Sequence, residues 1–541
     1  MKQLFLACTL LITMYACTYG QGSLNPSIRK VNMVMYAIEN MYVDEVDGDK
    51  LAEDAIIGLL EKLDPHSNYM TPEEVKELNE PLQGNFDGIG VQFNMLTDTL
   101  YIVQVIPGGP SEKVGIMAGD RIIYVNDSLI AGVKMKNSDV MSRLRGPKGT
   151  TVNVKIQRGK NSNLLDFKIV RDKIPIHSLD ASYMLDKETG YIKLNRFAAT
   201  SYDEFKDAMK KLQAQGMKDL VFDLQGNGGG YLNASIEIAN EFLKQGSLIV
   251  YTEGTHQKRD DAKANYKGSF QKGRLVILVD EASASASEIV SGAIQDWDRG
   301  VIVGRRTFGK GLVQRPIPLS DGSMIRLTTA RYYTPTGRSI QKPYENGDSE
   351  TYNKELIERY NHGEMISADS IHFPDSLKYT TLVEQRTVYG GGGIMPDYFV
   401  PFDTTKYTSF HREVGGKGII NKYVMNLMEQ NRAAYKSQYP NFDTFYKNFI
   451  ISDNMLNELL SLYKKDKAEE LKEDSYTLTE EQQKEFEKSK SLIQLQIKAL
   501  IGREVLGENE YYQIINEDNE SLLKAIEIIR NPEEYTKLLK K

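Results

Sequence analysis

A serine-rich turn follows an apolar segment near the middle of the 541-residue chain. Residues 274–279 (RLVILV) predict a buried strand, and residues 280–289 (DEASASASEI) leave it and begin a predicted helix. A serine at such a turn lies at the positive end of the helix dipole, where free backbone N–H groups can stabilise an oxyanion. Ser285 is therefore a candidate nucleophile. Ser285 and Glu288 also have the spacing of a capping box, and this segment by itself favours the simpler interpretation that Ser285 begins the helix.

Two further turns carry residues that would complete a serine–lysine site. Residues 307–314 (TFGKGLVQ) come just after the next predicted strand and hold Lys310 between two glycines. Residues 223–230 (DLQGNGGG) follow an earlier strand, and their glycines would let backbone amides approach a ligand closely. If the strands are parallel neighbours, all three turns lie at one edge of the sheet, the usual place for an α/β site. A phosphate-binding loop is the alternative for either turn, but residues 309–312 (GKGL) lack the full glycine spacing and the Ser/Thr after the lysine.

Lysine can serve as the base of such a site only when its amine is uncharged. A serine hydroxyl is a poor nucleophile until a base takes its proton. Deprotonating a lysine with a pKa of about 10.4 at pH 7 costs about 4.6 kcal/mol. Apolar walls lower that pKa, and Phe308 and Val303 are candidates to supply them at Lys310. Because a carboxylate would have the opposite effect, we expect Glu288 and Asp296 to support the helix or its neighbours without contacting the ammonium group.

Other catalytic classes fit the sequence less well. None of the six histidines follows a strand of this core at a clean turn, which argues against a Ser–His–Asp site. His66, within residues 63–67 (LDPHS), is expected to order a turn. No pair of histidines has metal-ligand spacing, so neither a metal site nor any other cofactor is expected.

The elements that would position these turns alternate between strands and helices. Residues 171–400 therefore predict a sheet with covering helices, an α/β core. Within them, residues 342–388 are polar, tyrosine-rich and aperiodic, and are expected to form an insertion or long surface loop. The strand-like runs are 190–194, 220–224, 274–279 and 301–303, and the amphipathic stretches lie around 201–215, 231–244 and 285–297.

Both ends of the chain have helical periodicity. Apolar residues recur at helical spacing within residues 26–80, and the chain beyond 403 is charged and helical. There, residues 479–482 (TEEQ) form a capping-box pattern. Ile493, Ile497 and Ile501 then line one helix face before Gly502, where the helix is expected to end.

Short strands with glycine turns begin at residue 84 and resemble a PDZ domain. The likeness rests on residues 88–93 (GIGVQF), the turn 107–110 (PGGP) and residues 118–122 (AGDRI). In that family the glycine-rich loop offers N–H groups to the terminal carboxylate of a peptide, which adds to a sheet edge as a strand. The resemblance implies a peptide-binding loop formed by Gly88, Ile89, Gly90 and Val91. A small β-barrel whose glycines only make turns is the alternative.

Together the three turns resemble the C-terminal processing, or tail-specific, serine peptidase family. The likeness runs from residues 64–67 (DPHS) through the PDZ-like segment to residues 392–397 (GGIMPD). The resemblance implies that Ser285 is the nucleophile, Lys310 the general base and Gln314 a residue that positions the lysine.

The same resemblance implies further site residues. The backbone N–H groups of Gly229 and Ala286 would form the oxyanion hole. The family usually has arginine where Gln225 stands, so a role of that arginine in ordering the loop does not transfer directly to this chain. Supporting roles fall to Glu288, Asp296 and Thr307.

Composition and the amino terminus restrict the class of protein. A mean hydropathy of −0.43 excludes a polytopic membrane protein. A net charge of −7 argues against a dedicated nucleic-acid binder. The only two cysteines, Cys8 and Cys17, exclude a disulfide framework or a cysteine-ligated zinc site. Lys2 followed by the apolar run 4–16 predicts a signal peptide, with lipid attachment at Cys17 as an alternative ending.

These observations predict a multidomain α/β (mixed α+β) protein. The expected parts are a signal peptide at 1–20, a helical region at 21–82, a PDZ domain at 83–172, a serine peptidase core at 173–402 and a helical domain at 403–541.

The predicted function is that of a serine endopeptidase exported to the bacterial periplasm or cell envelope. It would cleave proteins at or near apolar carboxy-terminal tails, and its PDZ domain would bind the tail or gate the site. Membrane contact is expected only through the signal peptide or lipid on Cys17, and a homo-oligomer or an adaptor is a candidate partner. The alternatives are a catalytically inactive PDZ adaptor and an assembly platform built on the helical tail.

Overall fold

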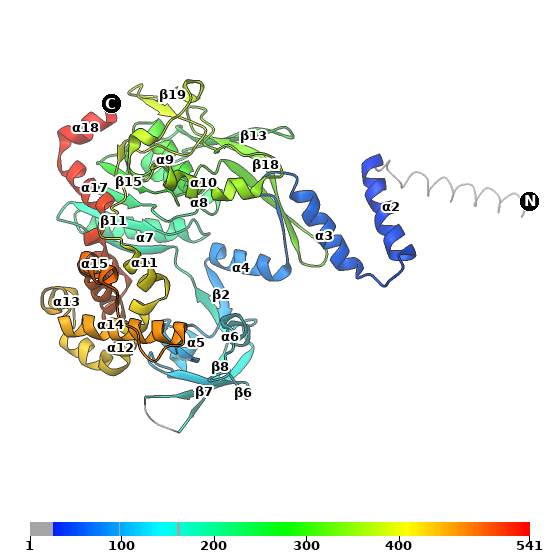
Figure 1. Ribbon diagram of the computed structural model, residues 1–541. Coiled ribbons are helices and arrows are strands. Elements are labelled where there is room, and N and C mark those ends of the chain that lie inside the picture. Colours follow the sequence, from blue (N-terminus) through cyan, green and yellow to red (C-terminus); the bar gives the residue numbers. More distant parts are fainter. Residues whose placement is uncertain (1–24, 97, 160–162, 541) are drawn as a thin grey trace, which may run out of the picture. The chain divides into compact units, whose positions relative to one another are not determined.

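The computed structural model describes residues 25–96, 98–159 and 163–540 (Figure 1). The signal peptide and Cys17 predictions lie outside these residues. The chain divides into two compact units. The first comprises Met1–Thr71, Pro316–Leu327 and Tyr344–Tyr352, and the second comprises Pro72–Arg315, Thr328–Pro343 and Asn353–Lys541.

The first unit is mainly helical, as the apolar spacing predicts. Its elements are α2 (Pro26–Met41), α3 (Gly48–Leu60) and β1 (Asn68–Met70), which pairs with the first residues of β18 (Met324–Tyr333). Asn25 and Asp47 begin the two helices, and each side chain accepts a backbone N–H of the first turn. His66 orders the turn before β1: its N–H donates to Asp64 Oδ1 (2.9 Å), and its Nε2 lies 2.9 Å from the hydroxyl of Tyr352.

A β-rich domain opens the second unit after α4 (Pro72–Gln83). One antiparallel sheet has the order β3-β4-β5-β7-β8, with β6 beside β5. Residues 151–157 alternate between exposed and buried side chains, the pattern of a strand with one face in a core. Its elements are β2 (Asn85–Gly88), β3 (Val91–Leu96), β4 (Thr99–Val105), α5 (Pro110–Lys113), β5 (Arg121–Val125), β6 (Ser128–Leu129), α6 (Asn137–Leu144), β7 (Thr151–Gln157), β8 (Leu165–Val170) and β9 (Asp172–Pro175).

The predicted α/β core is confirmed by a six-stranded sheet of order β10-β11-β12-β15-β16-β21. All pairs from β11 onward are parallel, and β12 and β15 are buried along their whole length, as a sheet covered on both faces requires. The strands are β10 (Leu179–Met184), β11 (Thr189–Leu194), β12 (Asp219–Asp223), β15 (Leu275–Val279), β16 (Val301–Gly304) and β21 (Tyr398–Phe399).

Different parts of the chain cover the two faces of this sheet. Helices α7 (Ser201–Ala214), α8 (Leu232–Phe242) and α9 (Ala286–Asp296) share one apolar cluster with the first face. Helices α17 (Glu520–Arg530) and α18 (Pro532–Lys540) share another with the second face, beside β11 and β15 in Figure 1. The last helices therefore complete the core, whereas the sequence placed them in a separate carboxy-terminal domain.

The remaining helices of that region form a bundle with a core of its own. Thr479 and Gln482 make the predicted capping box at the start of α15. The helix continues past Gly502 to Val505, contrary to expectation. A side chain at Gly502 would meet Ile514 at 2.9 Å, so this glycine permits close packing inside the helix and does not end it. The bundle consists of α11 (Ser409–Gly416), α12 (Ile419–Gln438), α13 (Phe442–Asn448), α14 (Asp453–Leu471), α15 (Glu480–Val505) and α16 (Glu508–Ile515).

The segment expected to be an insertion or long surface loop, 342–388, contains regular structure. Helix α10 (Ser349–Asn361) lies within it, followed by the short pair β19 (Lys378–Thr380) and β20 (Thr387–Tyr389). Polar contacts hold this helix: Arg359 donates to the carbonyl oxygens of Arg306 (2.8 Å) and Thr307 (3.1 Å). Apolar spacing, the only pattern searched for, did not indicate this helix; that the segment is an insertion stays a prediction. A further sheet contains β13 (Leu248–Gly254), β14 (Gln257–Lys263), β17 (Leu312–Pro318) and β18.

Candidate active site

Three turns meet at the carboxyl edge of the core sheet, as parallel pairing of β12, β15 and β16 requires. Ser283 Oγ donates to the carbonyl oxygen of Leu224 (2.8 Å), and the N–H of Phe308 donates to the carbonyl oxygen of Ser283 (3.0 Å). The N–H of Ala284 donates to the carbonyl oxygen of Asn227 (3.0 Å). The turns that contain Gly229, Ser285 and Lys310 are therefore bonded to one another.

Ser285 lies at the start of α9 in a strained backbone conformation. Its φ is +55° and its ψ is −111°, a region that non-glycine residues rarely occupy. Such strain persists only where surrounding contacts impose it, and it is frequent at functional sites. The side chain of Ser285 is half-buried, and Ala286 behind it is the first residue of the helix. The Ala286 N–H is among the first amides of that helix, which have no intrahelical acceptor.

Two groups hold the backbone of Ser285 beside that of Lys310. One carboxylate oxygen of Glu288 accepts the N–H groups of both Ser285 (2.8 Å) and Lys310 (2.9 Å). The hydroxyl of Tyr332 contacts the carbonyl oxygens of both residues, at 3.1 Å from that of Ser285. The serine and the lysine are thus bridged by one carboxylate oxygen and by one hydroxyl.

Glu288 is fully buried and accepts two more hydrogen bonds. Its second oxygen accepts from Thr307 Oγ1 (2.5 Å) and from the N–H of Gly309 (2.7 Å). Burial raises the pKa of the Glu288 carboxyl to about 7, and these hydrogen bonds oppose the rise. Thr307 in turn accepts the N–H of Ile394 (2.7 Å). Glu288 therefore fastens the lysine turn to the first turn of the serine helix.

The loop that contains Gly229 lies directly against Ser285. A side chain at Gly229 would meet Ser285 Cβ at 2.8 Å and the Ala284 carbonyl oxygen at 2.9 Å, and the φ of Gly229 is +104°. Only glycine fits both restrictions. The N–H of Gly229 donates to Asn227 Oδ1 (2.9 Å). The two candidate oxyanion donors, Gly229 and Ala286, therefore flank the serine, and one of them is bonded to Asn227 in this structure.

The other candidate residues have different surroundings. Gln314 lies on β17, and its Nε2 donates to the carbonyl oxygen of Leu312 (3.1 Å). Asp296 lies at the far end of α9, about 15 Å along the helix from Ser285. It accepts the N–H (2.9 Å) and hydroxyl (2.8 Å) of Thr336 and pairs with the buried Arg338. Asp296 anchors a neighbouring turn.

The structure corrects the expected place of Val303 in an apolar wall around Lys310, and the contribution of Phe308 to that wall stays a prediction. Val303 points into the cluster beneath α17, while its neighbour Ile302 faces the α9 side, because successive side chains of a strand alternate between faces. The centroid of the Phe308 ring lies 4.2 Å from the ammonium nitrogen of Lys342. Burial lowers the pKa of Lys342.

Sequence reasoning missed two residues of this site. Tyr332 belongs to an ordinary strand pattern, and nothing in one sequence connects it with turns at 285 and 310. Asn227 indicated only a turn, yet its side chain accepts from Gly229 and donates to Leu194, and its carbonyl oxygen accepts from Ser287 and Ala284.

The loop expected to bind peptides connects β2 to β3 in the β-rich domain. Gly88 ends β2, and Ile89 and Gly90 accept backbone hydrogen bonds from Ser111 and Ile106 (both 3.0 Å). A cavity of about 80 Å³ opens beside it. Its lining is mostly apolar and consists of Phe86, Ile89, Gly90, Val91, Phe93, Met141, Leu144 and Arg145.

Two other features bear on the class of protein. Among the described residues, no group of three or more His, Cys, Asp or Glu side chains could hold a metal ion. Within the same residues, no helix has both the length and the apolar character needed to cross a membrane.

Family models match most of these parts. The model of peptidase family S41 matches residues 188–349, and a PDZ model matches residues 88–169. The model of the activating protease CtpB N-terminal domain matches residues 16–74, and that of a family of unknown function matches residues 410–507. The PDZ-like interpretation of the sequence is thereby confirmed.

Individual proteins are also similar. The carboxy-terminal-processing protease of Bartonella bacilliformis is 35% identical over 345 residues, which cover 62% of this chain and 78% of that protein. Carboxy-terminal processing protease CtpA of Bacillus subtilis is 34% identical over 340 residues, covering 62% and 72%. Among solved structures, the photosystem II D1 C-terminal processing protease is 29% identical and covers 59% of this chain and 90% of its own, with a TM-score of 0.33.

The raised pKa of Glu288 predicts a specific dependence of stability on pH. Between its ordinary value of about 4.5 and its folded value of about 7, the folded state binds more protons than the unfolded state. The free energy of unfolding should therefore fall as pH rises through this window, by about 3 kcal/mol from this group, and stay level above it. Urea titrations of wild type and Glu288→Gln at pH 5, 6, 7 and 8 measure the effect. Wild type should lose stability relative to the variant up to pH 7, and parallel curves would contradict the assignment.

Proposed function

Because the chain belongs to peptidase family S41, as a C-terminal processing protease with a PDZ domain, we propose that it cleaves protein substrates with a catalytic dyad of Ser285 and Lys310. The observation that carries the proposal is the shared clamp on these two residues. One oxygen of Glu288 accepts both backbone N–H groups, and the hydroxyl of Tyr332 contacts both carbonyl oxygens.

In the proposed reaction, the neutral amine of Lys310 takes the hydroxyl proton of Ser285 as the serine oxygen attacks the substrate carbonyl carbon. The tetrahedral oxyanion accepts hydrogen bonds from the N–H groups of Ala286 and Gly229. Lys310 returns the proton to the leaving amine, and an acyl-enzyme ester remains. A water molecule then gives a proton to Lys310 and attacks the ester, and Ser285 recovers its proton when the carboxylic acid product leaves.

The oxyanion step requires a local change at Gly229. Its N–H donates to Asn227 Oδ1 in this structure, so the peptide group between Gly228 and Gly229 turns toward the substrate when the site is occupied. Because Gly229 has no Cβ, this rotation brings no side-chain clash with Ser285.

Glu288 and Thr307 are assigned as positioning residues of the dyad. Neither residue transfers a proton in the proposed reaction. The four hydrogen bonds to Glu288 come from the backbone N–H groups of Ser285, Gly309 and Lys310 and from the hydroxyl of Thr307. Gln314 is assigned to the lysine side of the site, and Asp296 to the support of α9.

The PDZ domain is proposed to bind the substrate tail. Its loop at Gly88–Val91 would receive the terminal carboxylate, and the tail would extend along β3. The apolar lining of the adjacent cavity favours a tail that ends in an apolar residue. Binding there would deliver the tail to Ser285 or gate the site.

The place of action is also a proposal. The predicted signal peptide at 1–20 directs the protein to the periplasm or cell envelope, with lipid on Cys17 as the alternative amino terminus.

Substitution of either dyad residue should abolish cleavage. Ser285→Ala and Lys310→Ala should each lower kcat by about 10³-fold or more on an unfolded protein with an apolar tail. Ser291→Ala, also on α9, should cleave like wild type, because its hydroxyl bonds only within the helix. Equal loss of substrate with wild type and Ser285→Ala would reject the dyad and leave the inactive PDZ adaptor.

Glu288→Gln should lower kcat by about tenfold to a hundredfold. One side of the amide would present N–H groups to two donors, so the clamp on Ser285 and Lys310 or on Gly309 would open. Glu204→Gln is the matched control, since Glu204 also accepts two backbone N–H groups, from Ser178 (2.9 Å) and Leu179 (3.0 Å), outside the site. Steady-state kinetics measured below the unfolding temperature of both variants show whether the loss of activity is specific to Glu288→Gln. The proposal fails if the two variants lose activity equally.

Tail recognition can be tested by changing only the substrate. Replacing the last two residues of an apolar tail by aspartate should lower kcat/KM by about tenfold or more, because charged groups lose their hydration in the apolar cavity. The Ser285→Ala protein should bind a labelled apolar tail peptide in fluorescence anisotropy, and the aspartate version should bind correspondingly less. Equal binding of both peptides would remove the PDZ cavity from substrate selection.

A further inference from the structure

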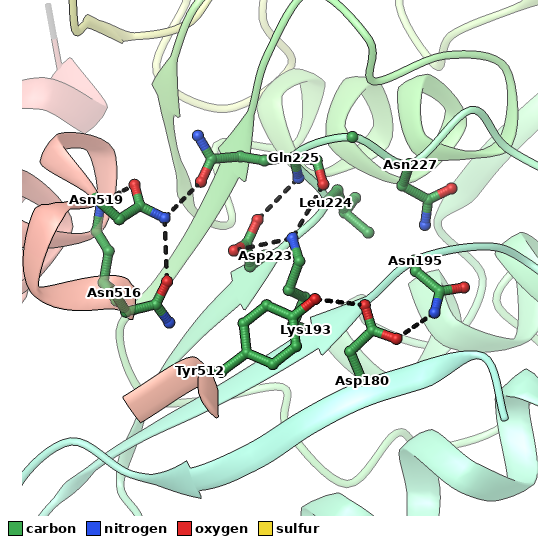
Figure 2. Close-up of polar contacts among 12 residues, drawn as sticks. Asp180, Lys193, Asn195, Asp223, Leu224, Gln225, Asn227, Tyr512, Asn516 and Asn519 are labelled. Carbon is green, nitrogen blue, oxygen red and sulfur yellow. Dashed lines mark hydrogen bonds and ion pairs between the residues drawn. The ribbon is translucent and has the colours of Figure 1, made fainter. Parts of the chain in front are cut away.

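The carboxy-terminal helices contact the loop that contains Gly229. Asn519 precedes α17, and its Nδ2 donates to Oε1 of Gln225 (2.9 Å). Figure 2 shows the two amide side chains directed toward each other, one from the carboxy-terminal segment and the other from the turn after β12. Asn519 lies 294 positions beyond Gln225 in sequence. A segment outside the S41 match thus reaches the catalytic edge of the sheet.

The same turn is fixed from the strand side. Lys193 on β11 donates its ammonium to the carbonyl oxygen of Gln225 (3.0 Å) and pairs with Asp223 (3.3 Å). The N–H of Gln225 donates to the other oxygen of Asp223 (2.8 Å). Asp223 is 1% exposed and Lys193 13% exposed, so this ion pair is little screened by water. Figure 2 draws these bonds around the backbone of Gln225.

The positive charge at this turn and its outward hydrogen bond come from different residues. With glutamine at position 225, the positive charge beside Asp223 comes from Lys193 on the neighbouring strand. The side chain of Gln225 is then available to bond outward, to Asn519.

A short turn joins Gln225 to Gly229 and is held at intermediate points. The N–H of Gly226 donates to the carboxylate of Asp280 (3.0 Å), and the N–H of Asn227 donates to the carbonyl oxygen of Leu224 (3.1 Å). Asn227 then contacts Gly229 directly. These contacts form a continuous connection from Gln225 to the Gly229 N–H beside Ser285.

We propose that Asn519 is a positioning residue for the oxyanion loop, so that the carboxy-terminal segment is part of the catalytic apparatus. It acts on Gly229 through Gln225, with Lys193 as the fixed support on the other side of the turn. This inference rests on the proposed dyad and oxyanion hole.

The test must preserve the second role of Asn519, whose Oδ1 accepts the N–H of Leu522 (3.2 Å) and caps α17. Asn519→Ser keeps a capping oxygen but is too short to reach Gln225. Gln225→Met removes the acceptor at similar side-chain length. The matched control is Asn509→Ser: Asn509, in the same carboxy-terminal segment, accepts the N–H of Ser182 (2.8 Å) on β10, away from the loop.

Asn519→Ser and Gln225→Met should each lower kcat by about tenfold and leave KM within about twofold, because a displaced oxyanion donor weakens the transition state alone. The double variant should be no slower than the slower single variant, since each change removes the same hydrogen bond between Asn519 and Gln225. Asn509→Ser should keep wild-type kcat, and thermal denaturation should give the same midpoint for Asn519→Ser and Asn509→Ser.

A second readout reports on the oxyanion hole itself. A peptide boronic acid forms a tetrahedral adduct with the serine, so its affinity for Asn519→Ser should fall by the same factor as kcat. Affinity of the PDZ domain for the product tail should be unchanged. Equal kcat for Asn519→Ser and Asn509→Ser, or multiplied losses in the double variant, would overturn the inference. Ser285→Ala in the same assay separates the two proposals. If Ser285→Ala cleaves the substrate, the proposed dyad is wrong. If Ser285→Ala is inactive while Asn519→Ser matches wild type, only the inference about Asn519 fails.

Discussion

The site depends on one buried carboxylate that joins two turns. Glu288 leaves the first turn of α9 and accepts hydrogen bonds from Ser285, Thr307, Gly309 and Lys310. Burial without partners would be costly for this group, and these four donors offset that cost. A cation at the carboxylate would have to compete with the backbone for the same oxygens. The arrangement therefore fixes the lysine turn through its backbone N–H groups.

The sheet places these turns at one level before any side chain acts. Asp223 pairs in register with Leu278, and Val279 pairs with Gly304, so β12, β15 and β16 end at the same edge. Each turn then leaves a rigid buried strand. Local contacts such as that of Ser283 with Leu224 need only complete an alignment that parallel pairing has already made.

Sequence patterns were sufficient for features that depend on local chemistry. The apolar runs predicted the core strands, and parallel pairing then predicted that the Gly229, Ser285 and Lys310 turns would meet. Patterns were insufficient where a contact depends on a distant residue: nothing near Tyr332 or Asn519 indicates which turn it reaches. Helix α10 was missed because polar contacts hold it, and the end of α15 was misplaced because Ile514 occupies the space beside Gly502. Val303 was expected on the face of the sheet near Lys310 but lies on the other face. Strand β16 is buried along its whole length, so its sequence has no polar–apolar alternation to show which residue faces which side.

The carboxy-terminal segment combines stability with positioning. A parallel sheet needs cover on both faces, and α17 supplies the second cover with Leu522, Ala525, Ile528 and Ile529, all buried. Asn519 is the cap of that helix, so its side chain inherits the rigidity of a buried apolar face. A hydrogen bond from such a residue loses little conformational entropy when it forms, since the backbone that carries it is already ordered by packing. The contacts of Gln225 with Lys193 on the next strand and with Asn519 at a covering helix therefore both start from elements that the core already fixes.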